Sequence, residues 1–217
     1  MSTLVVIQPS FLPWLGYFDL IDKSSVFVFY DHVQYDKNGW RNRNRIISNY
    51  SDWQWLTVPV NASLKSSIKD VKIENWEFSK KKIIKKLVQS YSKHPNFNET
   101  FNLINKIFGK NYSNISDLSI DLTIEICKKL EIKINFFRSS EYNNLKDKNE
   151  NLIAWCKRVG CKSYLSGISA KNYIDKDLFK RNKIELIWHN YNHQKYKQFK
   201  NEDFLSNLSV IDYLFNR

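Results

Sequence analysis

The sequence is poor in the residues that mark disulfide-bonded, repetitive or membrane-spanning proteins. Its 217 residues include three cysteines, five glycines and four prolines. An odd number of cysteines does not form a disulfide framework, and low glycine and proline contents argue against a repetitive or disordered chain. No apolar run approaches the roughly 20 residues that span a bilayer, and the apolar stretch at residues 4–7 is too short for a signal peptide. We therefore expect a cytoplasmic globular protein without membrane insertion.

Several motifs that carry chemistry or recognise nucleic acid are also missing. The sequence has no glycine-rich phosphate loop and no Gly-x-Ser-x-Gly turn. It has no helix-turn-helix, zinc-finger or ribonucleoprotein motif, so we expect no specific DNA binding. Two cysteines and two histidines have spacings that zinc could use, but one cysteine falls in a helical apolar stripe that is typical of a core. We expect no metal and no cofactor; the four residues are Cys156, Cys161, His189 and His193.

What the sequence has in excess is positive charge. Lysine and arginine number 34 against 22 aspartate and glutamate, which gives a net charge of +12 and a pI near 9.5. Such a field attracts phosphorylated substrates, acidic lipid headgroups or nucleic acid. An AT-rich coding sequence also raises the lysine content without functional meaning. The composition therefore admits an enzyme with a phosphorylated substrate and, as an alternative, a basic nucleic-acid-binding module.

The order of apolar patterns predicts an α/β protein of one domain, residues 1–217. Residues 4–7 are typical of a strand buried on both faces of a parallel sheet, and a helix over 14–22 and a strand over 26–30 complete a β-α-β unit. From about 77 to 131 the period is helical. We expect further strands over 45–47, 54–60, 68–73, 132–137, 163–165 and 184–188, and helices over 150–159 and 204–215. The predicted fold is a largely parallel, Rossmann-like three-layer sheet with an inserted helical middle region and a small antiparallel extension.

Ligands of open α/β sheets bind outside the carboxyl ends of the strands. Four segments rich in polar and aromatic residues follow predicted strands, and they span residues 8–17, 31–44, 166–173 and 189–198. In the first segment the order of strand, proline loop and helix resembles nucleotidyltransferases with a His-x-Gly-His turn. Trp14 and Tyr17 stand where the two histidines would be, so the phosphate-binding histidines are absent. A nucleotidyltransferase-like enzyme with an altered motif is one alternative.

The second segment interleaves cations, amides and aromatic rings. Its arginines suit bidentate contacts to phosphate, and Tyr35 or Trp40 could stack on a base. A nucleoside linked through a pyrophosphate satisfies both features, whereas a solvated basic hairpin is the simpler interpretation.

Several short motifs, taken in their order along the chain, resemble those of the WbqC-like family. They are Gln8-Pro9, 13–18 (Pro-Trp-Leu-Gly-Tyr-Phe), Asp31 with 33–35, 40–44, 55–60, 164–167 and 208–216. The resemblance runs from about residue 5 to the C-terminus. Members of that family occur in gene clusters for O-antigens and related glycans. The resemblance implies an enzyme that makes or decorates a nucleotide-linked sugar, as an N-acyl or N-aminoacyl transferase whose donor is a carrier protein, coenzyme A or aminoacyl-tRNA.

Acylation of an amine needs an acceptor for the amine proton and donors for the acyl oxygen. His193 follows the last predicted strand, and Asp31, at the end of the second, could assist it. His32 is the rival base, while Ser166 and Gly167 could present N–H groups to an oxyanion. Each has a plainer interpretation, as a surface histidine, a turn residue or a tight turn. The substrate-binding candidates share a place at predicted strand ends: Gln8, Trp14, Tyr17, Gln34, Tyr35, Lys37, Trp40, Arg41, Asn42, Arg43, Ser166, Gly167, Tyr196 and Gln198.

Overall fold

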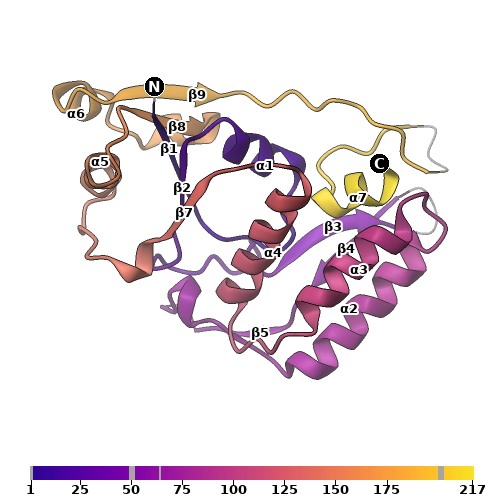
Figure 1. Ribbon diagram of the computed structural model, residues 1–217. Coiled ribbons are helices and arrows are strands. Elements are labelled where there is room, and N and C mark those ends of the chain that lie inside the picture. The colour runs from indigo at the N-terminus through magenta and orange to yellow at the C-terminus, as the bar shows by residue number, and fades with distance from the viewer. Residues whose placement is uncertain (1, 49–51, 64, 200–202) are drawn as a thin grey trace.

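The computed structural model describes residues 2–48, 52–63, 65–199 and 203–217, and a five-stranded parallel sheet lies at its centre (Figure 1). The strands are β1 (Thr3–Ile7), β2 (Val26–Phe29), β7 (Asn135–Arg138), β8 (Ser163–Gly167) and β9 (Glu185–His189). Their order across the sheet is β7-β2-β1-β8-β9, and each neighbouring pair is parallel. Counted along the chain this order reads 3-2-1-4-5, which is the order of a Rossmann sheet. The α/β prediction is confirmed.

Helices cover both faces of this sheet. Successive residues of a strand point to opposite sides, so the apolar strands β1 and β2 present a side chain to each face that must be buried. On one face Val5, Phe27 and Phe29 pack in the larger apolar core with α1 (Leu15–Asp22) and α4 (Ile115–Lys129). On the other face the alternate residues of β1 and β2 pack against α5 (Lys148–Arg158) and α6 (Lys176–Arg181). Figure 1 shows the two helix pairs on opposite sides of the sheet. Each fully buried large apolar side chain contributes about 1.5–3 kcal/mol to folding.

The chain between β2 and β7 forms the middle region. The hairpin of β3 (Arg43–Ile47) and β4 (Trp53–Thr57) and the short pair of β5 (Val60–Asn61) and β6 (Lys72–Ile73) are antiparallel. Two further helices follow, α2 (Trp76–Tyr91) and α3 (Phe97–Phe108), before α4 returns the chain to the sheet. The side chains of Asn75 and Asn114 accept hydrogen bonds from the first turns of α2 and α4 and so fix where these helices begin. The antiparallel extension and the helical middle region thus take the predicted places.

Some predicted elements differ from the structure. Residues 68–73 were expected to be one strand, but a 3-10 turn, η1 (Ile68–Asp70), precedes the two residues of β6, and the Ser67 hydroxyl binds the Asp70 carboxylate across that turn. A helix was expected over 204–215, whereas α7 is confined to Val210–Asn216 because Asn207 has a left-handed backbone (φ 59°) and Ser209 caps the helix. Among the described residues, no helix combines the length and apolarity needed to cross a membrane.

Candidate functional site

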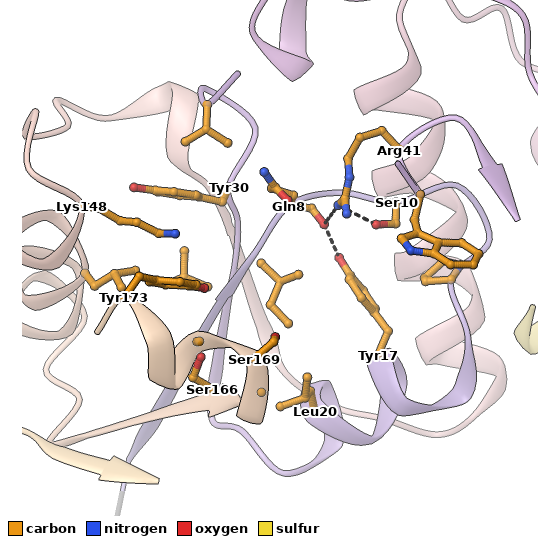
Figure 2. Close-up of a pocket in the computed structure, with 18 of the residues that line it drawn as sticks. Gln8, Ser10, Tyr17, Leu20, Tyr30, Arg41, Lys148, Ser166, Ser169 and Tyr173 are labelled. Carbon is orange, nitrogen blue, oxygen red and sulfur yellow. Dashed lines mark hydrogen bonds between the residues drawn. The ribbon is translucent and has the colours of Figure 1, made fainter. Parts of the chain in front are cut away.

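A cavity of about 900 Å³ opens where the strand order reverses, at the carboxyl ends of β1 and β8 (Figure 2). Residues after β1, β2 and β8, the hairpin β3–β4, the start of α5 and the 3-10 turn η3 (Ile168–Asn172) line it. This is the place where open α/β sheets bind their ligands, because the crossover helices leave the sheet on opposite faces there and a crevice remains between them. The volume lies within the range of small-molecule sites, about 300–1,000 Å³.

One wall of the cavity is the loop after β1, which Arg41 braces. Its Nη1 donates to Ser10 Oγ at 2.8 Å and to the Gln8 carbonyl oxygen at 3.2 Å, while its Nε lies 3.0 Å from the Asp36 carboxylate. The Tyr17 hydroxyl donates to the same Gln8 oxygen at 3.2 Å, as the dashed lines of Figure 2 show. The Arg41 side chain is 11% exposed and lines the cavity, and its guanidinium holds the loop in place.

The same wall explains a glycine inside helix α1. A Cβ atom added at Gly16 would lie 2.5 Å from the six-membered ring of Trp14, which packs directly on the glycine backbone. Trp14 lines the cavity, and its ring also contacts Tyr191 edge-on with centroids 5.1 Å apart. The Pro-Trp-Leu-Gly motif therefore places a tryptophan at the mouth of the cavity, and only glycine leaves room for it.

The opposite wall combines a lysine with two tyrosines. Lys148 Nζ lies 3.4 Å from the centroid of the Tyr173 ring, and Tyr30 stands beside them in Figure 2. Partial burial lowers the pKa of Lys148 and raises that of Tyr173. The Tyr30 hydroxyl accepts a hydrogen bond from Asn151 Nδ2 at 2.9 Å, which fixes the ring that faces Lys148. A planar ligand group between the two walls would meet aromatic faces and a cation.

The charge of the cavity is one-sided. Its described lining residues include two arginines and two lysines but no aspartate or glutamate: Arg41, Arg45, Lys146 and Lys148. The guanidinium of Arg45 lies 4.6 Å from the Trp53 ring and 5.2 Å from the Trp40 ring, and its Nε has no hydrogen-bond partner among the described residues. Arg45, Lys146 and Lys148 are thus cations without an ion-pair partner in the described structure. Such a cavity favours an anionic ligand.

His32 also lines the cavity and is a base that can titrate near neutral pH. Its Nδ1 lies 2.7 Å from Ser139 Oγ, and its ring meets the Tyr30 ring edge-on with centroids 4.7 Å apart. Burial lowers the pKa of His32, although the Asp31 carboxylate opposes that effect. The imidazole is therefore neutral near pH 7 and able to accept a proton.

The structure brings nine of the seventeen predicted site residues to the cavity. Those that line it are Gln8, Trp14, Tyr17, His32, Gln34, Trp40, Arg41, Ser166 and Gly167. Three others hold the middle region together: Tyr35 donates to Asn42 Oδ1 at 2.9 Å, Asn42 donates to the Val58 carbonyl oxygen at 2.9 Å, and Arg43 stacks over Trp55 at 4.3 Å. Lys37 is exposed to solvent.

No residue of the segment 189–198 lines the cavity, although the rings of Tyr191 and His193 pack against Trp14, which does. Tyr196 and Gln198 both donate to the buried Asp212 carboxylate, at 2.7 and 3.0 Å, so they serve the packing of α7. Tyr196 also borders a second, smaller hollow of about 490 Å³ beside α1. His193 Nε2 lies 3.0 Å from Asn207 Oδ1, and Asn207 rather than His193 lines the cavity.

The predicted partnership of Asp31 with His193 is not formed. Asp31 is fully buried, and its oxygens accept hydrogen bonds from Arg138 Nη2 at 3.0 Å, Ser140 N at 2.9 Å and Ser139 Oγ at 3.1 Å. Asp31 follows β2, whose neighbours are β1 and β7, whereas His193 follows the edge strand β9. Asp31 reaches His32 through Ser139 instead.

Sequence reasoning missed one side of the cavity. Lys146 and Lys148 follow β7, and Tyr30 comes directly after β2. The strand over 132–137 was predicted, so the rule that ligands bind at carboxyl ends would have selected the residues after it. The cysteines and His189 are placed elsewhere: Cys156 and Cys161 lie in the core beside α5, and His189 pairs with Asp19.

The chain is similar to known proteins over almost its whole length. The model of the family described as the WbqC-like protein family matches residues 8–217. A Mycobacterium tuberculosis (strain ATCC 25618 / H37Rv) protein named Uncharacterized protein Rv1507c is 33% identical over 220 residues, which cover 100% of this chain and 94% of that protein. No solved structure matches the chain significantly.

Proposed function

Because the chain belongs to the WbqC-like protein family, we propose that it is a cytoplasmic transferase that acylates the amino group of a nucleotide-linked amino sugar in the synthesis of an O-antigen or related surface glycan. The observation that carries this proposal is the cavity at the point where the strand order reverses. It has about 900 Å³, four cations and no carboxylate among its described lining residues.

The cavity suits both ends of such a substrate. Arg45, Lys146 and Lys148 offer free charges to the diphosphate, since Arg41 is already committed to the loop after β1. The aromatic rings of Trp14, Trp40, Tyr30 and Tyr173 supply flat surfaces for the base and the sugar. The absence of lining carboxylates avoids repulsion of the phosphates.

The groups needed for acyl transfer line the same cavity. His32 is neutral near pH 7 and accepts the proton that the attacking amine releases. Ser166 and Ser169 lie below the two walls in Figure 2 and, with the backbone at Gly167, supply donors for the acyl oxygen as it gains charge.

The test has two parts. A thermal-shift screen should show stabilisation by nucleotide-linked amino sugars, because a ligand that binds the folded state alone raises the melting temperature. Mass spectrometry should then detect acylated sugar when acyl-coenzyme A, an acyl carrier protein or aminoacyl-tRNA is supplied. Release of pyrophosphate from a nucleoside triphosphate would instead favour the alternative function of a nucleotidyltransferase. Equal stabilisation by random DNA, with no effect of nucleotide sugars, would favour a basic binding module.

A further inference from the structure

A chain of three side chains connects the buried carboxylate at the end of β2 with the cavity. Ser139 Oγ lies 3.1 Å from Asp31 Oδ1 and 2.7 Å from His32 Nδ1. Ser139 follows β7, the neighbour of β2 in the sheet, and both Ser139 and Asp31 are fully buried. The contact therefore depends on the pairing of two strands that are more than a hundred residues apart in the sequence.

The direction of this chain depends on which of its two neighbours receives the proton of the Ser139 hydroxyl. A hydroxyl donates one hydrogen bond and accepts two. Ser139 Oγ accepts one from Asp31 N at 3.0 Å and a longer, weaker one from His32 N at 3.4 Å. If its proton pointed to His32, the Asp31 carboxylate oxygen would face a hydroxyl lone pair at 3.1 Å. If its proton points to Asp31, His32 Nδ1 donates at 2.7 Å, and the longer contact from His32 N is a third and weaker approach to the same oxygen.

The Asp31 carboxylate is surrounded by donors in this arrangement. The Nε and Nη2 atoms of Arg138 donate to Asp31 Oδ2 at 3.2 and 3.0 Å, and Ser140 donates from both its backbone and its hydroxyl, at 2.9 and 2.8 Å. A carboxylate held by these donors is the stronger acceptor for the Ser139 proton, since hydrogen bonds to an ionised group are stronger than those between neutral groups.

We propose that Asp31 and Ser139 hold His32 in the tautomer with hydrogen on Nδ1, so that Nε2 carries the lone pair that accepts a proton in the cavity. Asp31 and Ser139 are positioning residues, and His32 is the group that meets the substrate. The tautomer rests on the contacts of Ser139 and on the acceptor strength of the Asp31 carboxylate, whereas the use of Nε2 as a base rests on the proposed acyl transfer.

In that reaction the amine nitrogen forms a bond to the acyl carbon, and the bond from that carbon to the sulfur or oxygen of the carrier breaks. One amine proton passes to His32 Nε2 and then to the departing sulfur or oxygen, so the imidazole returns to its starting state. The burial that lowers the pKa of His32 keeps Nε2 free near pH 7. The charged groups near the ring are Asp31 and, through it, Arg138.

The test is the ¹⁵N NMR spectrum of the histidine side chains of the full chain at pH 8, with His32 assigned by loss of its signals in His32→Gln. The expected wild-type pattern is a protonated Nδ1 and an unprotonated Nε2. Ser139→Ala should shift His32 toward the Nε2-protonated form that free histidine favours in water. Ser140→Ala is the matched control, because Ser140 binds Asp31 but not His32; it should leave the tautomer unchanged.

An Nε2-protonated wild-type His32 would overturn the proposal, and so would a tautomer that Ser139→Ala leaves unchanged. Because the wild-type spectrum is itself decisive, the test survives poor folding of a variant. Activity gives the second readout: His32→Gln should lower kcat by about 100- to 10,000-fold, and Ser139→Ala should lower kcat by a smaller factor without raising KM. The expected tautomer without any transfer activity would refute the proposed function and leave the tautomer assignment intact.

Discussion

The buried pair of Asp31 and Arg138 gives a prediction whose size follows from the structure. Asp31 is fully buried, and the Arg138 side chain is 30% exposed. Replacing Arg138 by Met removes the only cation bound to that carboxylate among the described residues. Breaking a buried pair in this way costs about 3–5 kcal/mol, because it leaves an uncompensated buried charge. The retained donors from Ser139 and Ser140 place the expected loss near the lower end, at about 3 kcal/mol.

Arg138→Met also removes an ion pair with Asp117 at 2.8 Å. The Asp117 side chain is 40% exposed, so this pair contributes only about 0.2–1 kcal/mol to the free energy of unfolding. Urea unfolding followed by tryptophan fluorescence should therefore show a loss of about 3–4 kcal/mol, which lowers the melting temperature by roughly 6–16 °C in a chain of this size. Lys128→Ala breaks the exposed pair with Glu125 inside helix α4 and should cost less than about 0.5 kcal/mol.

A double variant separates lost charge pairing from lost packing. In Asp31→Asn/Arg138→Met the buried charge is gone, so the combined loss should be smaller than the sum of the two single losses. If Arg138→Met costs no more than Lys128→Ala, or if the two single losses add, the carboxylate is not held by Arg138 as described.

Three further outcomes follow from burial. Burial lowers the pKa of both His32 and His94, so the unfolded state binds more protons than the folded state at acidic pH. The free energy of unfolding should therefore fall as the pH drops below about 6.5. In urea titrations, His94→Gln should make this fall with pH shallower. An unchanged slope would contradict the burial of His94. Gly16→Ala should lower the free energy of unfolding by about 1–3 kcal/mol and weaken ligand binding, since the new methyl group displaces the Trp14 indole beside it. Scanning and titration calorimetry that find neither effect would refute the packing of Trp14 on Gly16. Burial raises the pKa of Cys127 and Cys156 to about 12, so an aromatic disulfide reagent at pH 8 should label neither until urea unfolds the chain.

The apolar patterns predicted the central sheet because its strands are buried on both faces. Residues 4–7 and 26–29 are apolar without interruption, which is typical of strands in a parallel sheet that is covered on both faces. Helix α6 was not predicted, because Phe179 is its single buried residue and six residues show no helical period. The turn at Ile68–Asp70 was mistaken for a strand because Ile68 and Val71 are both buried, and burial alone does not distinguish the two.

The site was harder to predict, because no local sequence pattern specifies the order of the strands in the sheet. The rule that ligands bind at carboxyl ends placed residues 8–17, 31–44 and 166–173 correctly beside the cavity. It failed for 189–198, since β9 is an edge strand and the chain after it runs across to α7 (Figure 1). Ser139 and Asp31 meet through the pairing of β2 with β7, which no spacing in the sequence reveals.

The most direct test of the central claim is to locate nucleotide-sugar binding in the cavity by isothermal titration calorimetry. The probes are UDP-glucosamine and dTDP-linked amino-dideoxy sugars, titrated into the wild type, Lys148→Met and the surface control Lys128→Met. We expect one site per chain, with Kd at least about tenfold weaker in Lys148→Met, because a hydrogen bond to a charged group contributes about 1.5–3 kcal/mol. The Kd of Lys128→Met should equal that of the wild type. Equal affinity in Lys148→Met, or no binding of any nucleotide-linked amino sugar to the wild type, would contradict the claim.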